Sequence, residues 1–245
     1  MRRLALALAL LAAAPASAES LAVALSTRSV SIGSDFSGAS ISLFGVIERD
    51  AQTVPRPGEY EVIVVVRGPE QRVLVQRRER RLGIWVNSAG QHFEAMPSYY
   101  GLFTTEDAAP LVLDQQGPAR RLSLASLGVG ADERETYRIA LAHRRMRNGL
   151  YMERYGAVTL MTKTFFRTEV PLPPLVEDGT YTVFVLLFAA GTPLDDQRLT
   201  FVVSKSGFEE QLSRLSQQRP LVYGLGAVVL ALVTGYVGGV VFRRG

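Results

Sequence analysis

The stretch Val62-Ile63-Val64-Val65-Val66 decides the fold class, because five consecutive β-branched residues strongly favour a strand. A run without polar alternation is typical of a strand that is buried on both faces. Gly68-Pro69 follows as a turn, and Val73 to Gln76 is expected to return as the hairpin partner. The run therefore predicts a strand deep inside a β domain.

Further segments rich in β-branched and aromatic residues lie on both sides of this run. The strands expected from them are 21–25, 41–47, 84–86, 157–168, 180–188 and 199–203. Short strands separated by Gly and Pro turns indicate a sandwich or a barrel. We expect a mainly β fold: an immunoglobulin-like β-sandwich with a helical insertion, plus a C-terminal single transmembrane helix.

One segment of the domain departs from the strand pattern. Residues 132–148 lack turn residues and are dense in Arg, Glu, Ala and Leu. Asp132 and Glu135 resemble a helix start, and Asn148-Gly149 resembles a helix stop. We expect a helix here and a second short turn at Leu150 to Tyr155, so that the helical insertion spans about 131–155.

The N-terminus has the pattern of a signal peptide. Met1-Arg2-Arg3 precedes 11 apolar residues (4–14), and Pro15-Ala16-Ser17-Ala18 follows with an A-x-A cleavage site. This apolar run is too short to cross a bilayer. We expect 1–18 to be the signal peptide, with an uncleaved anchor as the alternative, and 19–204 to be the exported domain.

The C-terminus predicts a membrane anchor. Leu221 to Phe242 is 22 residues without a charge, which as a helix spans about 33 Å, enough for a hydrocarbon core of about 30 Å. The arginines of the tail, 243–245, favour a cytoplasmic C-terminus under the positive-inside rule. The expected organisation is a juxtamembrane helix at 205–219, a transmembrane helix at 221–242, and the bulk of the chain in the periplasm at the bacterial inner membrane.

A stripe of small residues runs along the predicted span. It recurs every fourth residue and consists of Ala227, Ala231, Gly235 and Gly239. Small residues allow a second helix to approach closely, so the stripe predicts an interface for self-association or for a permease helix. The alternative is that glycine is simply common in membrane helices.

Composition excludes several classes of function. The chain has no cysteine, which excludes disulfides, thiolate metal sites and a lipoprotein anchor. The four arginines at positions 2, 3, 243 and 244 supply the whole net charge of +4, so no nucleic-acid footprint remains. G-x-S-x-G, P-loop and H-E-x-x-H patterns are missing from the sequence. We therefore assign no catalytic residues and no cofactor.

Three sets of residues are candidates for binding. His92, Glu94 and His143 are weak candidates for a metal site, against the simpler interpretation of surface or core histidines. Tyr99 and Tyr100 could form a loop that contacts a partner or closes the end of the sandwich. The third set could bind an anion such as sulfite or sulfate, or form a charged edge that discourages strand addition; it is Arg77, Arg78, Arg80 and Arg81. An anion site would gain donors if the Arg144, Arg145 and Arg147 cluster folded beside it.

The only tryptophan, Trp85, stands between apolar neighbours on an expected strand. A tryptophan in such a position packs in the core of many sandwiches, so we expect core packing rather than a ligand platform.

Several short motifs, in their order and spacing, resemble the Alph_Pro_TM family of transmembrane proteins from alphaproteobacteria. They are Phe44-Gly45, Ile84-Trp85-Val86-Asn87, Pro97-Ser98-Tyr99-Tyr100, Phe166-Arg167, Leu172-Pro173, Gly179-Thr180-Tyr181, Lys205-Ser206-Gly207 and Tyr223-Gly224. The resemblance implies a single-span exported protein without an established activity. It also implies an association with sulfite-exporter-type permeases, and it carries over no catalytic residues.

These observations lead to three functional hypotheses. The favoured one is a membrane-anchored extracytoplasmic accessory or interaction protein that contacts the lipid bilayer and an integral membrane partner, such as a sulfite-exporter-type permease. The alternative is a periplasmic anion-binding module that uses the arginine clusters. A metal-dependent enzyme is the third, and two isolated histidines support it poorly.

Overall fold

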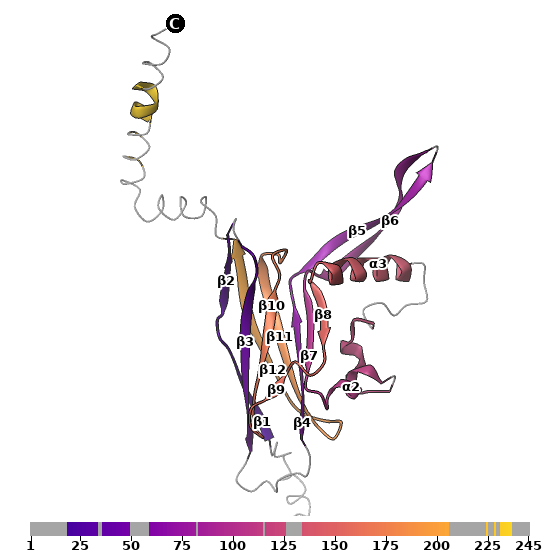
Figure 1. Cartoon of the computed structure of the whole chain (residues 1–245), viewed down its shortest axis with the longest axis vertical. Coiled ribbons are helices and arrows are strands. Elements are labelled where there is room, and N and C mark those ends of the chain that lie inside the picture. The colour runs from indigo at the N-terminus through magenta and orange to yellow at the C-terminus, as the bar shows by residue number, and fades with distance from the viewer. Residues whose placement is uncertain are drawn as a thin grey trace, which may run out of the picture. The chain divides into compact units, whose positions relative to one another are not determined.

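The computed structural model describes residues 19–33, 36–49, 59–81, 83–114, 116–125, 134–205, 224, 228 and 231–236. Within these residues the chain is mainly β and forms several sheets (Figure 1). The first sheet has the strand order β1-β3-β10-β9. Its strands are β1 (Glu19–Leu25), β3 (Ala39–Arg49), β10 (Phe165–Leu172) and β9 (Thr159–Leu160).

The second sheet has the order β2-β12-β11-β4-β7-β8. Its strands are β2 (Ser29–Ile32), β12 (Thr192–Lys205), β11 (Gly179–Ala189), β4 (Tyr60–Arg67), β7 (Tyr100–Thr104) and β8 (Tyr151–Arg154). β7 and β8 are parallel. A parallel pair requires a long crossover, and the chain from 105 to 150 supplies it with α2 (Ala109–Leu113), the 3₁₀ helix η1 (Arg120–Leu122) and α3 (Arg134–Arg147).

The β-branched run lies in β4, and all five of its residues are buried, as its sequence predicted. Val66 and Val64 pair with Val183 and Val185 of β11, whose side chains also point into the interior. The crossover between β7 and β8 contacts this sheet. One such contact is the hydroxyl of Tyr100 in β7, which donates to the carbonyl of Leu122 in η1. A strand covered on both sides needs no polar alternation.

The expected hairpin between β4 and 73–76 is wrong. At Gly68-Pro69 the chain leaves the sheet and is held by the facing strand: Gly68 N–H donates to Tyr99 O, and Ser98 N–H donates to Pro69 O, both at 2.8 Å. Beyond this point, β5 (Glu70–Arg81) pairs with β6 (Ile84–Pro97) as a separate two-stranded sheet. Figure 1 shows this β5–β6 hairpin projecting from the other sheets.

Polar contacts join the two larger sheets. The hydroxyl of Tyr60 in β4 donates to Glu19 Oε1 in β1 at 2.8 Å, and the hydroxyl of Tyr99 donates to the carbonyl of Pro171 in β10, also at 2.8 Å. The interior between the sheets holds alternating apolar residues of facing strands, such as Ile41 and Leu43 of β3. Alternation of this kind is typical of two packed β layers.

The helical and C-terminal expectations have different outcomes. A helix forms at 134–147 as expected, but Tyr151–Arg154 is a strand, because it pairs with β7 along its length.

The predicted transmembrane helix at 221–242 is wrong: among the residues described, no helix is long and apolar enough to cross a membrane. The fold is therefore corrected to a mainly β protein of several sheets.

Several expectations fall on residues that the structure does not describe. These are the signal peptide 1–18, the juxtamembrane residues 206–219, the tail 243–245, and two members of the small-residue stripe, Ala227 and Gly239. Ala231 and Gly235 are described and lie within the helical stretch 231–236.

Two of the motifs noted in the sequence meet across β3 and β10. Gly45 pairs with Phe166, and Phe44 pairs with Arg167. The Arg167 guanidinium lies 5.9 Å from the centre of the Phe44 ring, and a Cβ on Gly45 would come within 2.0 Å of the Phe166 ring. Gly45 is therefore required by close packing, since the buried Phe166 ring occupies the space of a side chain.

We predict that Gly45→Ala destabilises the domain by about 1–3 kcal/mol, because the added methyl group overpacks a tight site. Thermal unfolding of the purified full-length protein, followed by circular dichroism, should show a lower Tm. Gly235→Ala is the control, because open space surrounds Gly235. Equal Tm values for Gly45→Ala and the parent protein would contradict this account of the packing.

Buried tyrosines predict a loss of stability in alkali. Burial raises the pKa of Tyr99, Tyr100 and Tyr181 above the ordinary value of 10.0, and raises that of Tyr151 to about 12. Above pH 10 the unfolded chain loses these protons before the folded chain does, so the contribution is complete below pH 10 and is lost as the pH rises. Urea unfolding at pH 8, 10 and 11.5 should give a falling free energy of unfolding. An unchanged value would refute the prediction.

Candidate functional site

The helix α3 is held against the base of the hairpin by a small apolar cluster. Leu141 of α3 packs with Phe93 and Met96 of β6, and the partly buried Tyr137 joins them. The Arg138 guanidinium lies 5.7 Å from the centre of the Phe93 ring. One face of α3 is therefore packed against the hairpin base, and residues on its opposite face are exposed to solvent.

A buried arginine fixes the end of α3. The guanidinium of Arg145 donates to the carbonyl of Pro97 at 2.9 Å and to the carbonyl of Ser98 at 2.7 Å. It also lies 5.4 Å from the centre of the Tyr151 ring, and the Tyr151 hydroxyl donates to the same Pro97 carbonyl at 2.6 Å. The helix end, the hairpin base and β8 thus meet at one hydrogen-bonded point.

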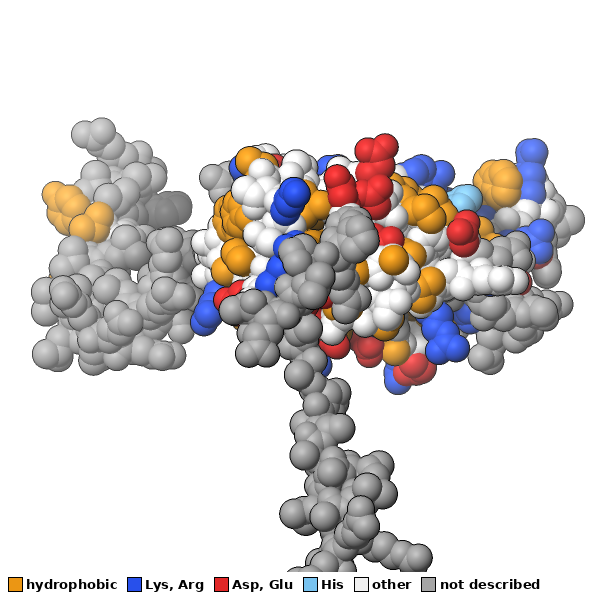
Figure 2. All heavy atoms as spheres, turned by 90° about the horizontal axis from the view of Figure 1, so that it is seen from below, with side chains coloured by type: hydrophobic (Ala, Val, Ile, Leu, Met, Phe, Trp, Pro, Cys, Tyr) orange, Lys and Arg blue, Asp and Glu red, His pale blue; other side chains and the backbone are white. Residues whose placement is uncertain are grey.

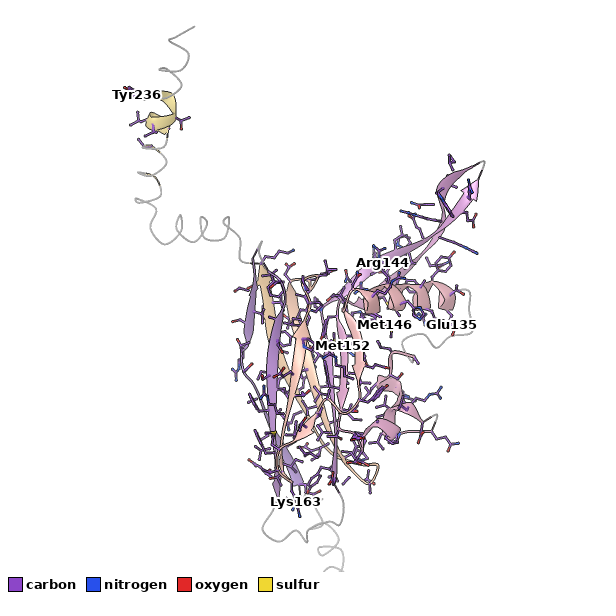
Figure 3. The ribbon with its side chains drawn as sticks, viewed as in Figure 1. Glu135, Arg144, Met146, Met152, Lys163 and Tyr236 are labelled. Carbon is purple, nitrogen blue, oxygen red and sulfur yellow. The ribbon has the colours of Figure 1, made fainter. Side chains whose placement is uncertain are left out.

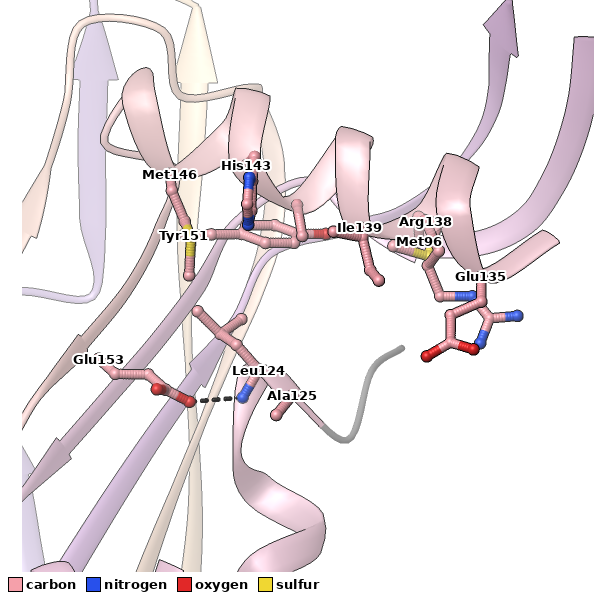
Figure 4. Close-up of a pocket in the computed structure, with 11 residues that line it drawn as sticks. Met96, Leu124, Ala125, Glu135, Arg138, Ile139, His143, Met146, Tyr151 and Glu153 are labelled. Carbon is pink, nitrogen blue, oxygen red and sulfur yellow. Dashed lines mark hydrogen bonds between the residues drawn. The ribbon is translucent and has the colours of Figure 1, made fainter. Parts of the chain in front are cut away.

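The outer face of α3 lines an open cavity of about 430 Å³, which we call the α3 groove (Figure 4). Glu135, Arg138, Ile139, Ala142, His143 and Met146 line it from the helix, and Met96, Leu124, Ala125, Tyr151 and Glu153 complete it. Ile139 is 43% exposed and Met146 is 42% exposed. The groove therefore presents an apolar helix face to solvent, with charged groups among its lining.

The wall opposite the helix is held by one carboxylate. Glu153 Oε1 accepts the backbone N–H of Leu124 at 2.5 Å, and its Oε2 accepts the hydroxyl of Tyr155 at 3.0 Å. Both oxygens of this side chain are occupied by local bonds. Glu153 therefore shapes the groove, by joining β8 to the segment after η1.

The far end of the β5–β6 hairpin carries the second candidate surface, the hairpin tip, of which the structure describes residues 78–81 and 83–87. Arg81 pairs with Ile84 across a tight turn in which Gly83 has φ 84°, and Arg80 pairs with Trp85. Trp85 is 69% exposed and Ile84 is 64% exposed, so the expectation that Trp85 packs in the core is wrong. Basic and hydrophobic side chains lie together at this end of the molecule (Figure 2).

The metal candidates are not brought together. His92 is exposed on β6, opposite Leu74. Glu94 forms a salt bridge with Arg72 at 2.7 Å, and His143 lies in the α3 groove. Within the described part of the chain, no group of three or more His, Cys, Asp or Glu residues could hold a metal ion.

The arginines predicted to bind an anion are split between environments. Arg78 and Arg80 are exposed at the hairpin tip, and Arg77 lines a second cavity of about 380 Å³ with the first half of α3. Arg81 lies at the end of β5, and its side chain is outside the described structure. The helix arginines do not join them: Arg145 is buried, and Arg144 lies near the other end of α3 from Glu135 (Figure 3).

Tyr99 and Tyr100 are fully buried rather than exposed in a loop. Tyr100 begins β7, and the ring of Tyr99 lies 5.9 Å from that of Tyr181. Of the two roles considered for this pair, the structure favours packing over contact with a partner. The groove was not predicted from the sequence, although Ile139, His143 and Met146 are spaced so that they share one helix face.

Comparison with protein families gives a match over residues 20–244 to the family described as "Putative transmembrane protein (Alph_Pro_TM)". No curated protein matches the chain. The match therefore covers nearly all of the described structure, including both the α3 groove and the hairpin tip.

We predict that Arg145→Met destabilises the protein by about 2–4 kcal/mol, because two buried carbonyls lose their donor and only Pro97 keeps another. Arg144→Met, on the exposed side of the same helix, is the matched control and should change stability by less than about 0.5 kcal/mol. Urea unfolding measures both variants. Similar losses for the two would mean that Arg145 does not fix the helix end.

Proposed function

The chain belongs to the Alph_Pro_TM family, and from this premise we propose that it is an accessory protein at a membrane whose β domain contacts an integral membrane partner. The signal-peptide pattern of 1–18 supports export, so the proposed location is the periplasmic side of the bacterial inner membrane. A sulfite-exporter-type permease is the partner class that we favour. The domain would act by binding rather than by catalysis.

The α3 groove is the observation that carries this proposal. Isolated exposed apolar residues are ordinary on a protein surface, but here two of them flank a concave site on a fixed helix. Arg145 and Leu141 hold the opposite face of α3 in place, so the groove is formed before a partner arrives. A preformed groove avoids part of the ordering cost of association.

The chemistry of the lining suits the apolar face of a partner helix. Met146 is exposed, and its flexible, polarisable side chain can pack against irregular surfaces. Glu135, Arg138 and His143 supply polar contacts beside this apolar floor. Protein interfaces combine an apolar centre with a polar rim in the same way.

Anion binding remains the second candidate. One observation supports it: Arg78 and Arg80 of β5 are two positions apart and are both exposed. Two exposed guanidinium groups attract an anion only weakly in water, because the charges are well solvated. We therefore rank it below the accessory role.

The experiment is crosslinking and affinity purification of the full-length protein from solubilised membranes. The variant Ile139→Glu with Met146→Glu places two charges on the apolar face of the groove, and we expect it to recover the membrane partner roughly ten-fold less well, equivalent to about 1.4 kcal/mol. Leu175→Glu, an exposed leucine outside the groove, is the matched control and should recover as much partner as the parent.

Two outcomes would contradict the proposed function. One is the absence of any stoichiometric membrane protein in the parent sample. The other is equal recovery by the groove variant and the parent protein, which would remove the groove from the interaction.

A further inference from the structure

We propose that the hairpin tip docks on an anionic lipid bilayer, with Trp85 and Ile84 at the boundary of headgroups and acyl chains and with Arg78 and Arg80 on the lipid phosphates. This interaction involves a different surface and a different partner from the α3 groove. It does not depend on the proposed partner protein.

The tip lies beyond the part of the hairpin that is packed. Val73 and Val75 of β5 lie against the cluster of Phe93, Met96 and Leu141 at the base. Arg77 lines the cavity beside α3, and the strands then continue as a two-stranded ribbon to the turn. Near this turn, Trp85 is 69% exposed and Ile84 is 64% exposed.

The charge of the tip complements an anionic surface. Residues 78–87 contain three arginines and one glutamate. Arg80 pairs directly with Trp85, so that its side chain and the indole stand on the same face of the ribbon. Near a membrane, each basic residue contributes about 1 kcal/mol of attraction to anionic lipids.

The combination of side chains favours lipid over protein. Tryptophan prefers the membrane–water interface because its ring is apolar and its N–H is polar. Arginine can lay its apolar stem along the lipid while its head reaches the phosphates. A protein hot spot is enclosed by a surrounding rim of contacts, and a narrow two-stranded tip has no such rim.

A charged edge that discourages strand addition would explain the arginines of β5. That role does not account for Trp85 and Ile84, whose large apolar side chains are exposed beside these arginines. Shallow insertion explains both features with one interaction.

The chain contains a built-in probe for the test, because Trp85 is its only tryptophan. The full-length protein is reconstituted into vesicles of phosphatidylglycerol and phosphatidylcholine, and into vesicles of phosphatidylcholine alone. We expect the Trp85 emission to shift to the blue, and to be quenched by doxyl groups placed shallowly on the acyl chains, in the anionic vesicles only.

Variants then test the role of charge. Arg78→Gln with Arg80→Gln should lower the ratio of docked to undocked tip by roughly 30-fold, from about 1 kcal/mol for each arginine. Arg144→Gln with Arg147→Gln removes the same charge from exposed sites on α3 and should leave the quenching unchanged. Circular dichroism of each variant establishes that the domain is folded.

Three results would overturn the proposal. The first is a lack of doxyl quenching in anionic vesicles, and the second is equal quenching in the neutral ones. The third is a Trp85 shift produced by inorganic phosphate or sulfate without vesicles, which would identify a site for free anions instead of a lipid surface.

Discussion

The hydrogen bonds of Arg145 to the carbonyls of Pro97 and Ser98 are the constraint on which the arrangement of α3, the hairpin base and the α3 groove depends. These carbonyls belong to the junction at which β6 ends and β7 begins, so one guanidinium ties a helix to the hairpin base and to the central sheet. The buried guanidinium is stabilised because its Nη1 donates to two carbonyls and because its centre lies 5.4 Å from the centre of the Tyr151 ring. Without it, α3 would lose the contact that fixes its C-terminal end, and the wall of the groove formed by the helix would be less firmly held.

Local patterns predicted those features that depend on neighbours in the sequence. The run Val62–Val66 is buried on both faces, and the helix at 134–147 lies within the segment that lacks turn residues. The partners of these elements could not be predicted in the same way. β4 pairs with β11 and β7, and no local signal distinguishes these strands from β5, which follows at once across Gly68-Pro69. Hydropathy alone also predicted a membrane-spanning helix at the C-terminus, which the described helical residues do not support.

Trp85 illustrates the same limit at the candidate sites. Ile84-Trp85-Val86 has the same local pattern whether its strand lies inside a sandwich or at the end of a ribbon. The difference is the absence of a third strand beside β5 and β6 among the described residues, which is a property of the topology. His143 was noticed for its ligand chemistry, yet it belongs with Met146 to one face of the groove. The paired motifs Phe44-Gly45 and Phe166-Arg167 were separate patterns in the sequence and become one packing unit in the sheet.

The strand order also determines when the domain can fold. β3 lies between β1 and β10, so Gly45 meets its partner Phe166 only after most of the chain has been made. The bond from Leu21 N–H to Asp195 joins residues 174 positions apart. During synthesis from the N-terminus, β3 can pair with β1 first, but its other edge stays unpaired until β10 has been made. Apolar residues of β3 such as Ile41 are exposed during this interval. Such a high contact order favours slow folding, so this open edge stays exposed to aggregation for longer than it would in a protein whose strands pair with their neighbours in the sequence.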